Sequence, residues 1–285
     1  MTEPQRDGQP QRVALVTGAN TGIGRVTARE LALQGMHVFV ACRSPERTQP
    51  LLDEIRAVAP AAKVEWLALD LADFGSVRHC AQTFLERGLP LNLLVNNAGI
   101  AAARGLTKDG FELAFGINHM GHFLLTQLLL ERIKTSAPAR IVTVASRAHY
   151  RASGIDFEAV RQTSKTLTGL AEYQVSKLAN VLFSAELARR LQGSGVTTYA
   201  LHPGVVATDV WRSVPAPLRG LVKLFLISPQ QGAATTLHCA TSPDLALQTG
   251  LYYDQCRSKF PSRMAQDPRL AAELWASSEG WTGPG

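Results

Sequence analysis

The sequence predicts an α/β protein with one doubly wound parallel sheet, of Rossmann type, with about seven strands and helices on both faces. Short runs rich in valine, leucine and isoleucine alternate with segments whose apolar residues recur at helical spacing. The first such run ends in a glycine cluster that opens a helical segment. No Pro/Gly-rich linker or repeat divides the 285 residues. We therefore expect a single domain over residues 1–285.

The composition, 46% apolar and 18% charged, is that of an ordinary globular protein. The net charge of +6 is not gathered in Lys/Arg runs or interleaved with aromatic residues, so we expect an anionic cofactor and no nucleic acid. Residues 1–11 form a polar tail without a signal-peptide core, which predicts a cytoplasmic protein with peripheral membrane contact left open. The apolar stretch Leu218 to Ile227 is too short to span a bilayer, so no transmembrane segment is expected.

The four cysteines have no C-x-x-C spacing, which disfavours a metal site or a disulfide framework. Cys42 and Cys239 lie in apolar surroundings. We expect them to be reduced core residues.

The first strand is expected at Val13 to Val16, and the first helix at Arg25 to Gln34. Three glycines separate them: Gly18, Gly22 and Gly24. A backbone that turns sharply and lets a pyrophosphate approach cannot carry Cβ atoms there, and the following helix offers free N–H donors. An ordinary βα turn is the alternative interpretation of this motif alone.

The second strand, Val38 to Cys42, is followed by Arg43. An acidic residue at this point would bind a ribose 2′-hydroxyl, whereas an arginine accommodates a 2′-phosphate. Arg43 therefore favours NADP over NAD, with Arg47 as a weaker helper and a solvated loop arginine as the alternative. The third strand, Val64 to Leu69, leads to Asp73, which we expect to cap the next helix.

The fourth strand, Leu91 to Val95, runs into the tetrapeptide Asn96 to Gly99. Its two amides can tie neighbouring loops together, and the Ala-Gly pair leaves room for a ribose. A long helical stretch follows, with His119 and His122 inside it; these histidines lack ligand-spaced partners and are expected to pack. The apolar members of the stretch are Phe111, Phe115, Leu124, Leu125, Leu128 and Leu129.

The fifth strand, Ile141 to Ala145, ends at Ser146, and a later helix carries Tyr173 and Lys177 four residues apart on one face. A lysine cation favours the phenolate, so we expect the pKa of Tyr173 to fall below its usual value of about 10. Ser146 stands at the carboxyl end of its strand, where open α/β sheets bind ligands, and its hydroxyl can stabilise charge on a substrate oxygen.

The sixth strand, Val196 to Leu201, leads to Pro203 and Gly204, a turn that can bring the backbone close to a nicotinamide. Residues 205–228 contain enough apolar side chains for a substrate lid, with a plain amphipathic helix as the alternative. Residues 254–285 form a C-terminal extension whose final helix is expected from Pro268 to Trp281.

The motifs T-G-x-x-x-G-I-G, N-N-A-G and Y-x-x-x-K, taken in order, resemble those of the short-chain dehydrogenase/reductase family over nearly the whole chain. The resemblance implies a catalytic tetrad of Asn118, Ser146, Tyr173 and Lys177, in which Asn118 holds a proton-relaying water. It implies that Asp70 contacts the adenine and that Thr208 contacts the carboxamide or phosphates. The implied cofactor-binding residues are Gly18, Asn20, Thr21, Gly22, Ile23, Gly24, Arg43, Asp70, Leu71, Asn97, Ala98, Gly99, Tyr173, Lys177, Pro203, Gly204, Val206 and Thr208.

The long interval from Ser146 to Tyr173 and the segments YQVSKLANVLFSAELARRL and TTYALHPGVVATDV resemble the retinol dehydrogenase branch of that family. The resemblance implies an NADP-dependent oxidoreductase, a carbonyl reductase or alcohol dehydrogenase, acting on a small lipophilic substrate such as retinal or retinol. It also implies a homodimer or homotetramer. Two alternatives remain: an NAD-linked secondary-alcohol dehydrogenase, and a catalytically idle NADP-sensing protein.

Overall fold

The computed structural model describes residues 11–204 and 227–283. The tail expected over residues 1–11 lies outside the described residues except for Gln11. The lid expected over residues 205–228 lies outside them except for Ile227 and Ser228.

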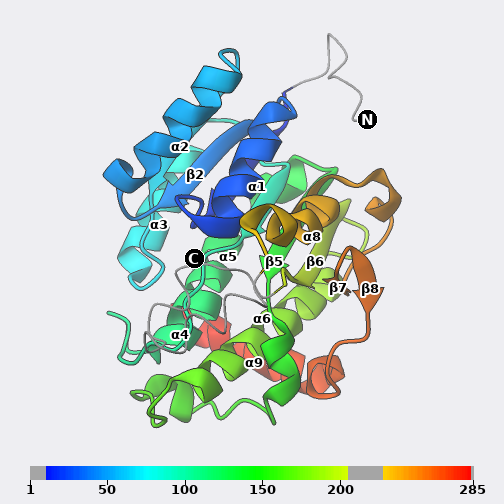
Figure 1. Cartoon of the computed structure of the whole chain (residues 1–285). Helices are drawn as coiled ribbons and strands as arrows, with labels where there is room; N and C mark the ends of the chain where they lie inside the picture. Colours follow the sequence, from blue (N-terminus) through cyan, green and yellow to red (C-terminus); the bar gives the residue numbers. More distant parts are fainter. Residues whose placement is uncertain (1–10, 205–226, 284–285) are drawn as a thin grey trace.

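One eight-stranded sheet, in the order β3-β2-β1-β4-β5-β6-β7-β8, forms the centre of the molecule (Figure 1). All neighbours pair in parallel except β7 and β8, which form an antiparallel hairpin. This arrangement confirms the predicted doubly wound sheet. The strands are β1 (Val13–Thr17), β2 (His37–Cys42), β3 (Val64–Ala68), β4 (Leu93–Asn96), β5 (Ala139–Val144), β6 (Val196–His202), β7 (Leu251–Asp254) and β8 (Arg257–Lys259).

Helices cover both faces of the sheet, and alternate residues of each central strand pack toward opposite faces. In β1, Val13 and Leu15 join one apolar cluster, whereas Ala14 and Val16 join the other. The helices α1 (Gly22–Leu33), α2 (Pro45–Val58) and α8 (Pro229–Thr241) lie on one side. On the other lie α3 (Phe74–Leu85), α5 (Gly121–Thr135) and α6 (Leu170–Arg190), with α9 (Pro268–Thr282) packed against α6.

The helical stretch expected around Phe111 to Leu129 is not one continuous α-helix. It consists of α4 (Leu113–Phe115), the π-helical turn η1 (Gly116–Met120) and α5. By length and composition Leu113–Thr135 could cross a membrane, the one such segment among residues 11–204 and 227–283. Of its most apolar window, 72% is buried inside the fold, as in the core helix of a folded domain.

Two strands at the sheet edge, β7 and β8, were not assigned from the sequence. β8 is three exposed residues without apolar alternation, and the turn before it places Gln255 and Cys256 at φ of 52° and 59°. Such a short edge hairpin carries no periodic signal. Four 3₁₀ turns also lie in the described loops: η2 (Arg147–Arg151), η3 (Ala159–Arg161), η5 (Pro243–Leu245) and η6 (Met264–Gln266).

Several local predictions are confirmed. Asp73 caps α3, and its carboxylate accepts from the backbone nitrogens of Gly75 at 2.8 Å and Ser76 at 3.4 Å. Cys42 and Cys239 are buried free thiols. The last helix, α9, begins at Pro268 as expected.

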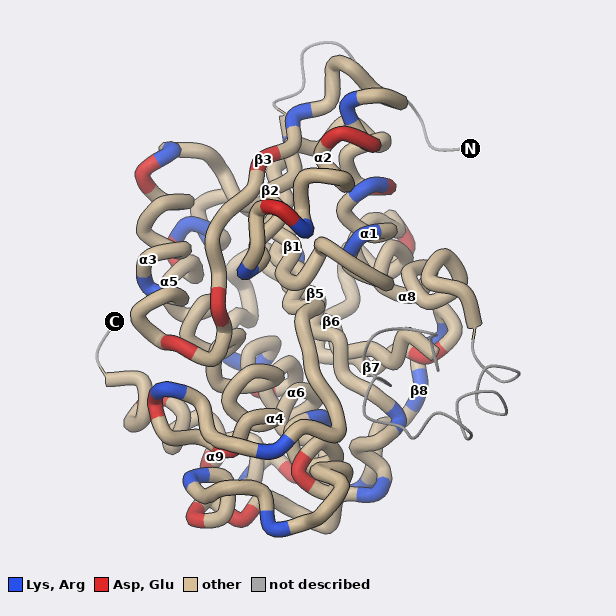
Figure 2. Tube along the Cα trace, turned by 60° about the vertical axis from the view of Figure 1, so that its left-hand side comes forward, with Lys and Arg blue, Asp and Glu red and all other residues tan. Residues whose placement is uncertain are grey.

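Charged residues of both signs are interspersed over α1, α2 and α3 (Figure 2). Arg25 and Arg29 of α1 both pair with Glu54 of α2, at 2.5 Å and 2.9 Å. These side chains are about one-third exposed, so each pair adds at most about 1 kcal/mol.

Candidate active site

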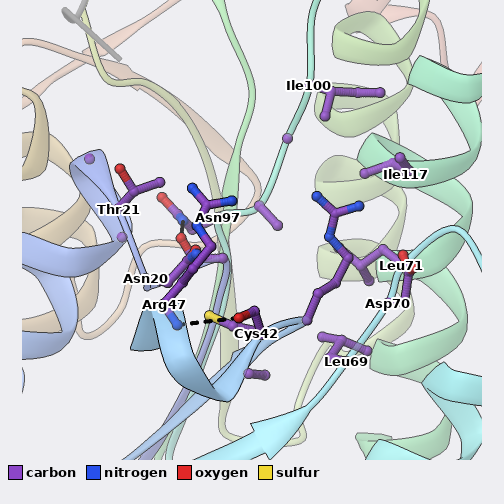
Figure 3. Close-up of a pocket in the computed structure, with 18 of the residues that line it drawn as sticks. Asn20, Thr21, Cys42, Arg47, Leu69, Asp70, Leu71, Asn97, Ile100 and Ile117 are labelled. Carbon is purple, nitrogen blue, oxygen red and sulfur yellow. Dashed lines mark hydrogen bonds between the residues drawn. The ribbon is translucent and has the colours of Figure 1, made fainter. Parts of the chain in front are cut away.

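A cavity of about 760 Å³ opens where the carboxyl ends of β1 and β4 meet (Figure 3). These strands are neighbours in the sheet, but the chain leaves them toward opposite sides, and such a switch point is where open α/β sheets bind ligands. In Figure 3, Asn20 and Thr21 face Asp70, Leu71 and Ile117 across the cavity. Its walls include twelve residues named from the sequence: Gly18, Asn20, Thr21, Gly22, Ile23, Gly24, Arg43, Asp70, Leu71, Asn97, Ala98 and Gly99.

The glycines of the first turn are required by close packing. Gly18 has φ of 65°, and a Cβ there would lie 2.8 Å from the Cα of Ala98. A Cβ on Gly24 would lie 2.4 Å from Nδ2 of Asn97 and 2.7 Å from the carbonyl oxygen of Gly18. The turn after β1 can therefore press against the Asn97–Ala98 segment after β4 only because both residues lack side chains.

The amino end of α1 faces this cavity without a side-chain cap. Thr21 occupies the N-cap position, but its side chain makes no capping hydrogen bond, and the first turn of α1 has no acidic residue. By contrast, Ser44 and Asp73 cap α2 and α3. The first amides of α1 and the positive end of its dipole are thus directed at the cavity, which suits a phosphate.

A single hydroxyl, that of Thr17, joins the two glycine-rich turns. Its Oγ1 accepts from the backbone nitrogens of Asn97 and Ala98, both at 3.0 Å, and lies 2.8 Å from Nε2 of His122. The Asn97 side chain donates to the Thr17 carbonyl oxygen at 2.8 Å. The prediction that the two amides tie neighbouring loops together is confirmed for Asn97, whereas the Asn96 side chain donates to Oγ1 of Thr126 in α5 at 3.1 Å. Thr17 itself was missed, although it directly precedes the first glycine of the motif.

The far end of the cavity is lined by Arg43 and Arg47, both exposed, and by Asp70. Asp70 uses one carboxylate oxygen to accept from the backbone nitrogen of Ala72 at 3.0 Å. The guanidinium groups of Arg43 and Arg47 supply positive charge to the cavity where the second strand ends.

Three of the predicted catalytic side chains come together beside β5. The hydroxyl of Ser146, just after the strand, hydrogen-bonds to the phenol of Tyr173. Lys177 lies one turn further along α6, with its Nζ 5.7 Å from the centre of the Tyr173 ring. That Nζ donates to the carbonyl oxygen of Val144 at 2.8 Å, which holds the ammonium at the carboxyl end of β5. Gly99 connects this cluster to the cavity, because a Cβ on it would lie 3.4 Å from the same Nζ.

Burial changes the acid–base behaviour of this cluster. The pKa of Lys177 is lowered from 10.5 to about 7 by burial. The pKa of Tyr173 is raised by burial, with the Ser146 hydrogen bond acting in the opposite direction. The prediction that Tyr173 has a lowered pKa is therefore wrong when only the protein's own groups act on the phenol. Desolvation of the phenolate is the largest effect on the pKa of Tyr173, and burial also disfavours the charge of the nearby lysine.

Asn118 lies in η1 and, like Lys177, borders Gly99. Its side chain clamps the backbone of Ile100: Oδ1 accepts from the nitrogen at 2.8 Å, and Nδ2 donates to the carbonyl oxygen at 2.9 Å. Nδ2 also donates to Ser176 Oγ at 2.9 Å. A Cβ on Gly99 would lie 3.2 Å from Oδ1, so Asn118 and Lys177 border the same glycine.

The remaining predicted contacts lie around the end of β6. Pro203 and Gly204 follow this strand, and Gly204 has φ of 92°. Val206, Thr208 and nearly all of the expected lid lie outside the described residues. The two histidines of the helical stretch are buried, as predicted: His119 pairs with Ser278 Oγ at 3.0 Å, and His122 with Thr17.

Known proteins resemble this chain over most of its length. The family model for short chain dehydrogenase matches residues 12–218. Mouse retinol dehydrogenase 12 is 45% identical over 269 residues, which are 93% of this chain and 84% of that protein. A crystal structure of an uncharacterized protein from Mycobacterium paratuberculosis has a TM-score of 0.75 and 37% identity, covering 95% of this chain and 93% of its own.

A second solved structure contains a nucleotide. It is a protein from Beutenbergia cavernae, described as an NAD(P)-dependent gluconate 5-dehydrogenase, with NADP bound at low occupancy. Its TM-score is 0.69 and its identity 26%, covering 86% of this chain and 94% of that one.

Proposed function

The chain belongs to the short-chain dehydrogenase family, in its retinol dehydrogenase-like branch, and we propose that it transfers hydride between NADP and a lipophilic carbonyl or alcohol. As a family member it is an oxidoreductase acting on CH–OH and C=O groups. The observation that carries this proposal is that the cavity and the cluster of catalytic side chains share a border at Gly99. Gly99 lines the dinucleotide-sized cavity and borders both Lys177 and Asn118.

Dinucleotide binding is supported by the uncapped amino end of α1 and by the glycine packing at Gly18 and Gly24. NADP, rather than NAD, is favoured by Arg43 and Arg47, which line the cavity just after β2. Cys42 stands where an acidic partner for a 2′-hydroxyl would otherwise be. The Beutenbergia structure, with NADP bound, is consistent with this choice.

We assign the proton chemistry to Tyr173 and its neighbours. In the reducing direction Tyr173 gives its phenol proton to the substrate oxygen, while Ser146 donates a hydrogen bond to that oxygen. The nicotinamide supplies or accepts the hydride when bound. Lys177, when protonated, stabilises the phenolate left on Tyr173, and Asn118 holds the turn of chain through which a water can return the proton. Alcohol oxidation reverses these steps.

The proposed role of Tyr173 is tested by Tyr173→Phe. We expect NADPH binding within about twofold of wild type and kcat reduced at least about a hundredfold, because the proton donor is gone but the cavity is unchanged. Tyr253→Phe is the matched control, since Tyr253 packs on the α8 side of the sheet and its hydroxyl bonds Oε1 of Gln248 at 2.6 Å. Turnover retained by Tyr173→Phe would overturn the assignment.

A lipophilic substrate is proposed from the apolar residues 210–227 and from the retinol dehydrogenases among the relatives. The test is NADPH oxidation with all-trans-retinal, nonanal and glyceraldehyde. We expect kcat/KM to rise with apolar surface, by up to about fourfold for each added methylene that is fully buried. A preference for glyceraldehyde would reject the lipophilic pocket without rejecting the enzyme.

A further inference from the structure

His149 is a fully buried histidine three residues after Ser146, in the turn η2. Its Nδ1 lies 2.6 Å from the carbonyl oxygen of Ser146, and its Nε2 lies 3.0 Å from the backbone nitrogen of Ser262. A carbonyl oxygen can only accept and a backbone N–H can only donate. The ring must therefore be neutral, with its proton on Nδ1.

The ring of His149 has little freedom to take another orientation. Its centre lies 4.1 Å from that of Tyr150 and 4.8 Å from that of Tyr252. The next side chain, Tyr150, donates its hydroxyl to the carbonyl oxygen of Phe260 at 2.6 Å. Two consecutive side chains of η2 thus hold the segment Phe260 to Ser262 against the end of β5. Burial lowers the pKa of His149, which keeps the ring neutral.

Ser146 needs this support because its hydroxyl makes hydrogen bonds to two different groups. Its Oγ accepts from the backbone nitrogen of Ala148 at 3.2 Å and hydrogen-bonds to Tyr173. The backbone of Ser146 is extended, with φ of −167° and ψ of 155°, at the point where the chain leaves β5 and enters η2. Its carbonyl oxygen accepts both from the backbone nitrogen of His149, at 3.2 Å, and from the ring. Of these two bonds the ring makes the shorter one.

We propose that His149 is a positioning residue for Ser146: it fixes the main chain of Ser146 and thereby aims the Ser146 hydroxyl at Tyr173 and the substrate oxygen. The segment Phe260 to Ser262 of the C-terminal extension is then part of the active-site support, through the N–H of Ser262. This inference rests on the role proposed for Ser146 above.

The two nitrogens of His149 can be tested separately. In His149→Asn the side-chain amide can still reach the Ser146 carbonyl, whereas in His149→Gln it reaches toward Ser262 and leaves that carbonyl without its ring donor. We expect kcat with all-trans-retinal, or with the fastest aldehyde of the panel above, to stay within about threefold of wild type in the Asn variant and to fall at least about tenfold in the Gln variant. KM for NADPH should change in neither variant.

Thermal unfolding separates positioning from mere stability. Thermal unfolding of the Asn and Gln variants should be similarly affected, since both lose the packed ring. An Asn variant as slow as the Gln variant, or a Gln variant with wild-type kcat, would overturn the positioning role.

The tautomer of His149 gives a readout that does not depend on turnover. Nitrogen-15 NMR of the ring should show the Nδ1–H neutral form at pH 7, and an Nε2–H form would overturn the proposal. Ser146→Ala separates the role proposed for Ser146 from the positioning role of His149. If this variant keeps full activity, the proposed role of Ser146 fails; if it is inactive while His149→Gln is not, only the positioning role fails.

Discussion

The hydroxyl of Thr17 has a complete set of hydrogen bonds, and the neutral state of His122 fixes its direction. His122 Nδ1 lies 3.0 Å from the carbonyl oxygen of Asn118, which can only accept, so Nδ1 carries the proton and Nε2 accepts from Thr17. Both lone pairs of Thr17 are then free for the N–H groups of Asn97 and Ala98. One residue thus links the turn that borders the cavity with the π-helical turn that carries Asn118.

Replacing Thr17 tests this link. Thr17→Val keeps the shape but leaves the amide of Ala98 and Nε2 of His122 without a partner, while the amide of Asn97 keeps only the carbonyl oxygen of Val95; each group left unsatisfied costs about 1–3 kcal/mol. We expect a clear loss of unfolding free energy in urea and weaker NADPH binding, measured by fluorescence titration. Thr17→Ser keeps the hydroxyl and should remain close to wild type in both. Equal behaviour of the Val and Ser variants would contradict the link.

The proposed preference for NADP over NAD is tested at Arg43. Arg43→Ala removes a charged hydrogen-bond donor to a phosphate, which is worth about 1.5–3 kcal/mol, so the Kd for NADPH should rise at least about tenfold while the Kd for NADH changes little. The exposed Arg56 of α2, which pairs with Asp53 at 3.7 Å, provides the control variant Arg56→Ala. Unchanged NADPH affinity in Arg43→Ala would favour the NAD-linked alternative.

At the level of elements, strand positions follow from the sequence because each buried strand is a short apolar run. The π-helical turn η1 does not. Its i+5 bond from the nitrogen of Gly121 to the carbonyl of Gly116 occurs where Asn118 grips the distant Ile100. No local pattern encodes that contact. Nor could the sequence show that burial raises the pKa of Tyr173, since desolvation depends on which segments cover the ring.

The tight packing of η1 yields a prediction for Gly116. A Cβ there would lie 2.3 Å from Cγ2 of Thr107 and 3.1 Å from Cβ of Phe111, so Gly116→Ala should lower the unfolding free energy by about 1–3 kcal/mol through overpacking. Gly280 in α9 is the matched control, because nothing lies within 4 Å of its Cβ position. Gly280→Ala should be neutral or stabilising by up to about 1 kcal/mol. Urea unfolding of both variants measures the difference, and equal stability would contradict the packing.

At the scale of the whole molecule, the C-terminal helix completes the core on one face of the sheet. Trp275 of α9 stacks on Phe183 of α6 at 5.9 Å between ring centres, and the guanidinium of Arg190 lies 4.3 Å from the Trp275 ring centre. Ser278 meets His119 of η1. The final helix was predicted, but its place against α6 and η1 was not, because no sequence pattern states which apolar face receives it.

The folded protein encloses three histidines whose rings are neutral. Burial lowers the pKa of His119 to about 3, and that of His122 and His202 to about 4. In the unfolded chain these rings take up protons below about pH 6.5. The folded state binds fewer protons, so the free energy of unfolding should fall as the pH drops from 6.5 toward 4. Above pH 6.5 these three rings contribute no pH dependence.

The size of this effect can be isolated at His119. Between pH 7 and pH 5 each such ring should remove about 2 kcal/mol of stability, which follows from about 1.36 kcal/mol per pH unit below the unfolded pKa. His119→Phe removes one titrating ring from a cluster that already contains Phe115 and Phe123. Whatever its stability at pH 7, the variant should lose about 2 kcal/mol less than wild type on going to pH 5, measured by urea unfolding at both pH values. Parallel losses in the two proteins would show that His119 takes up its proton without unfolding, and that α9 does not hold it neutral.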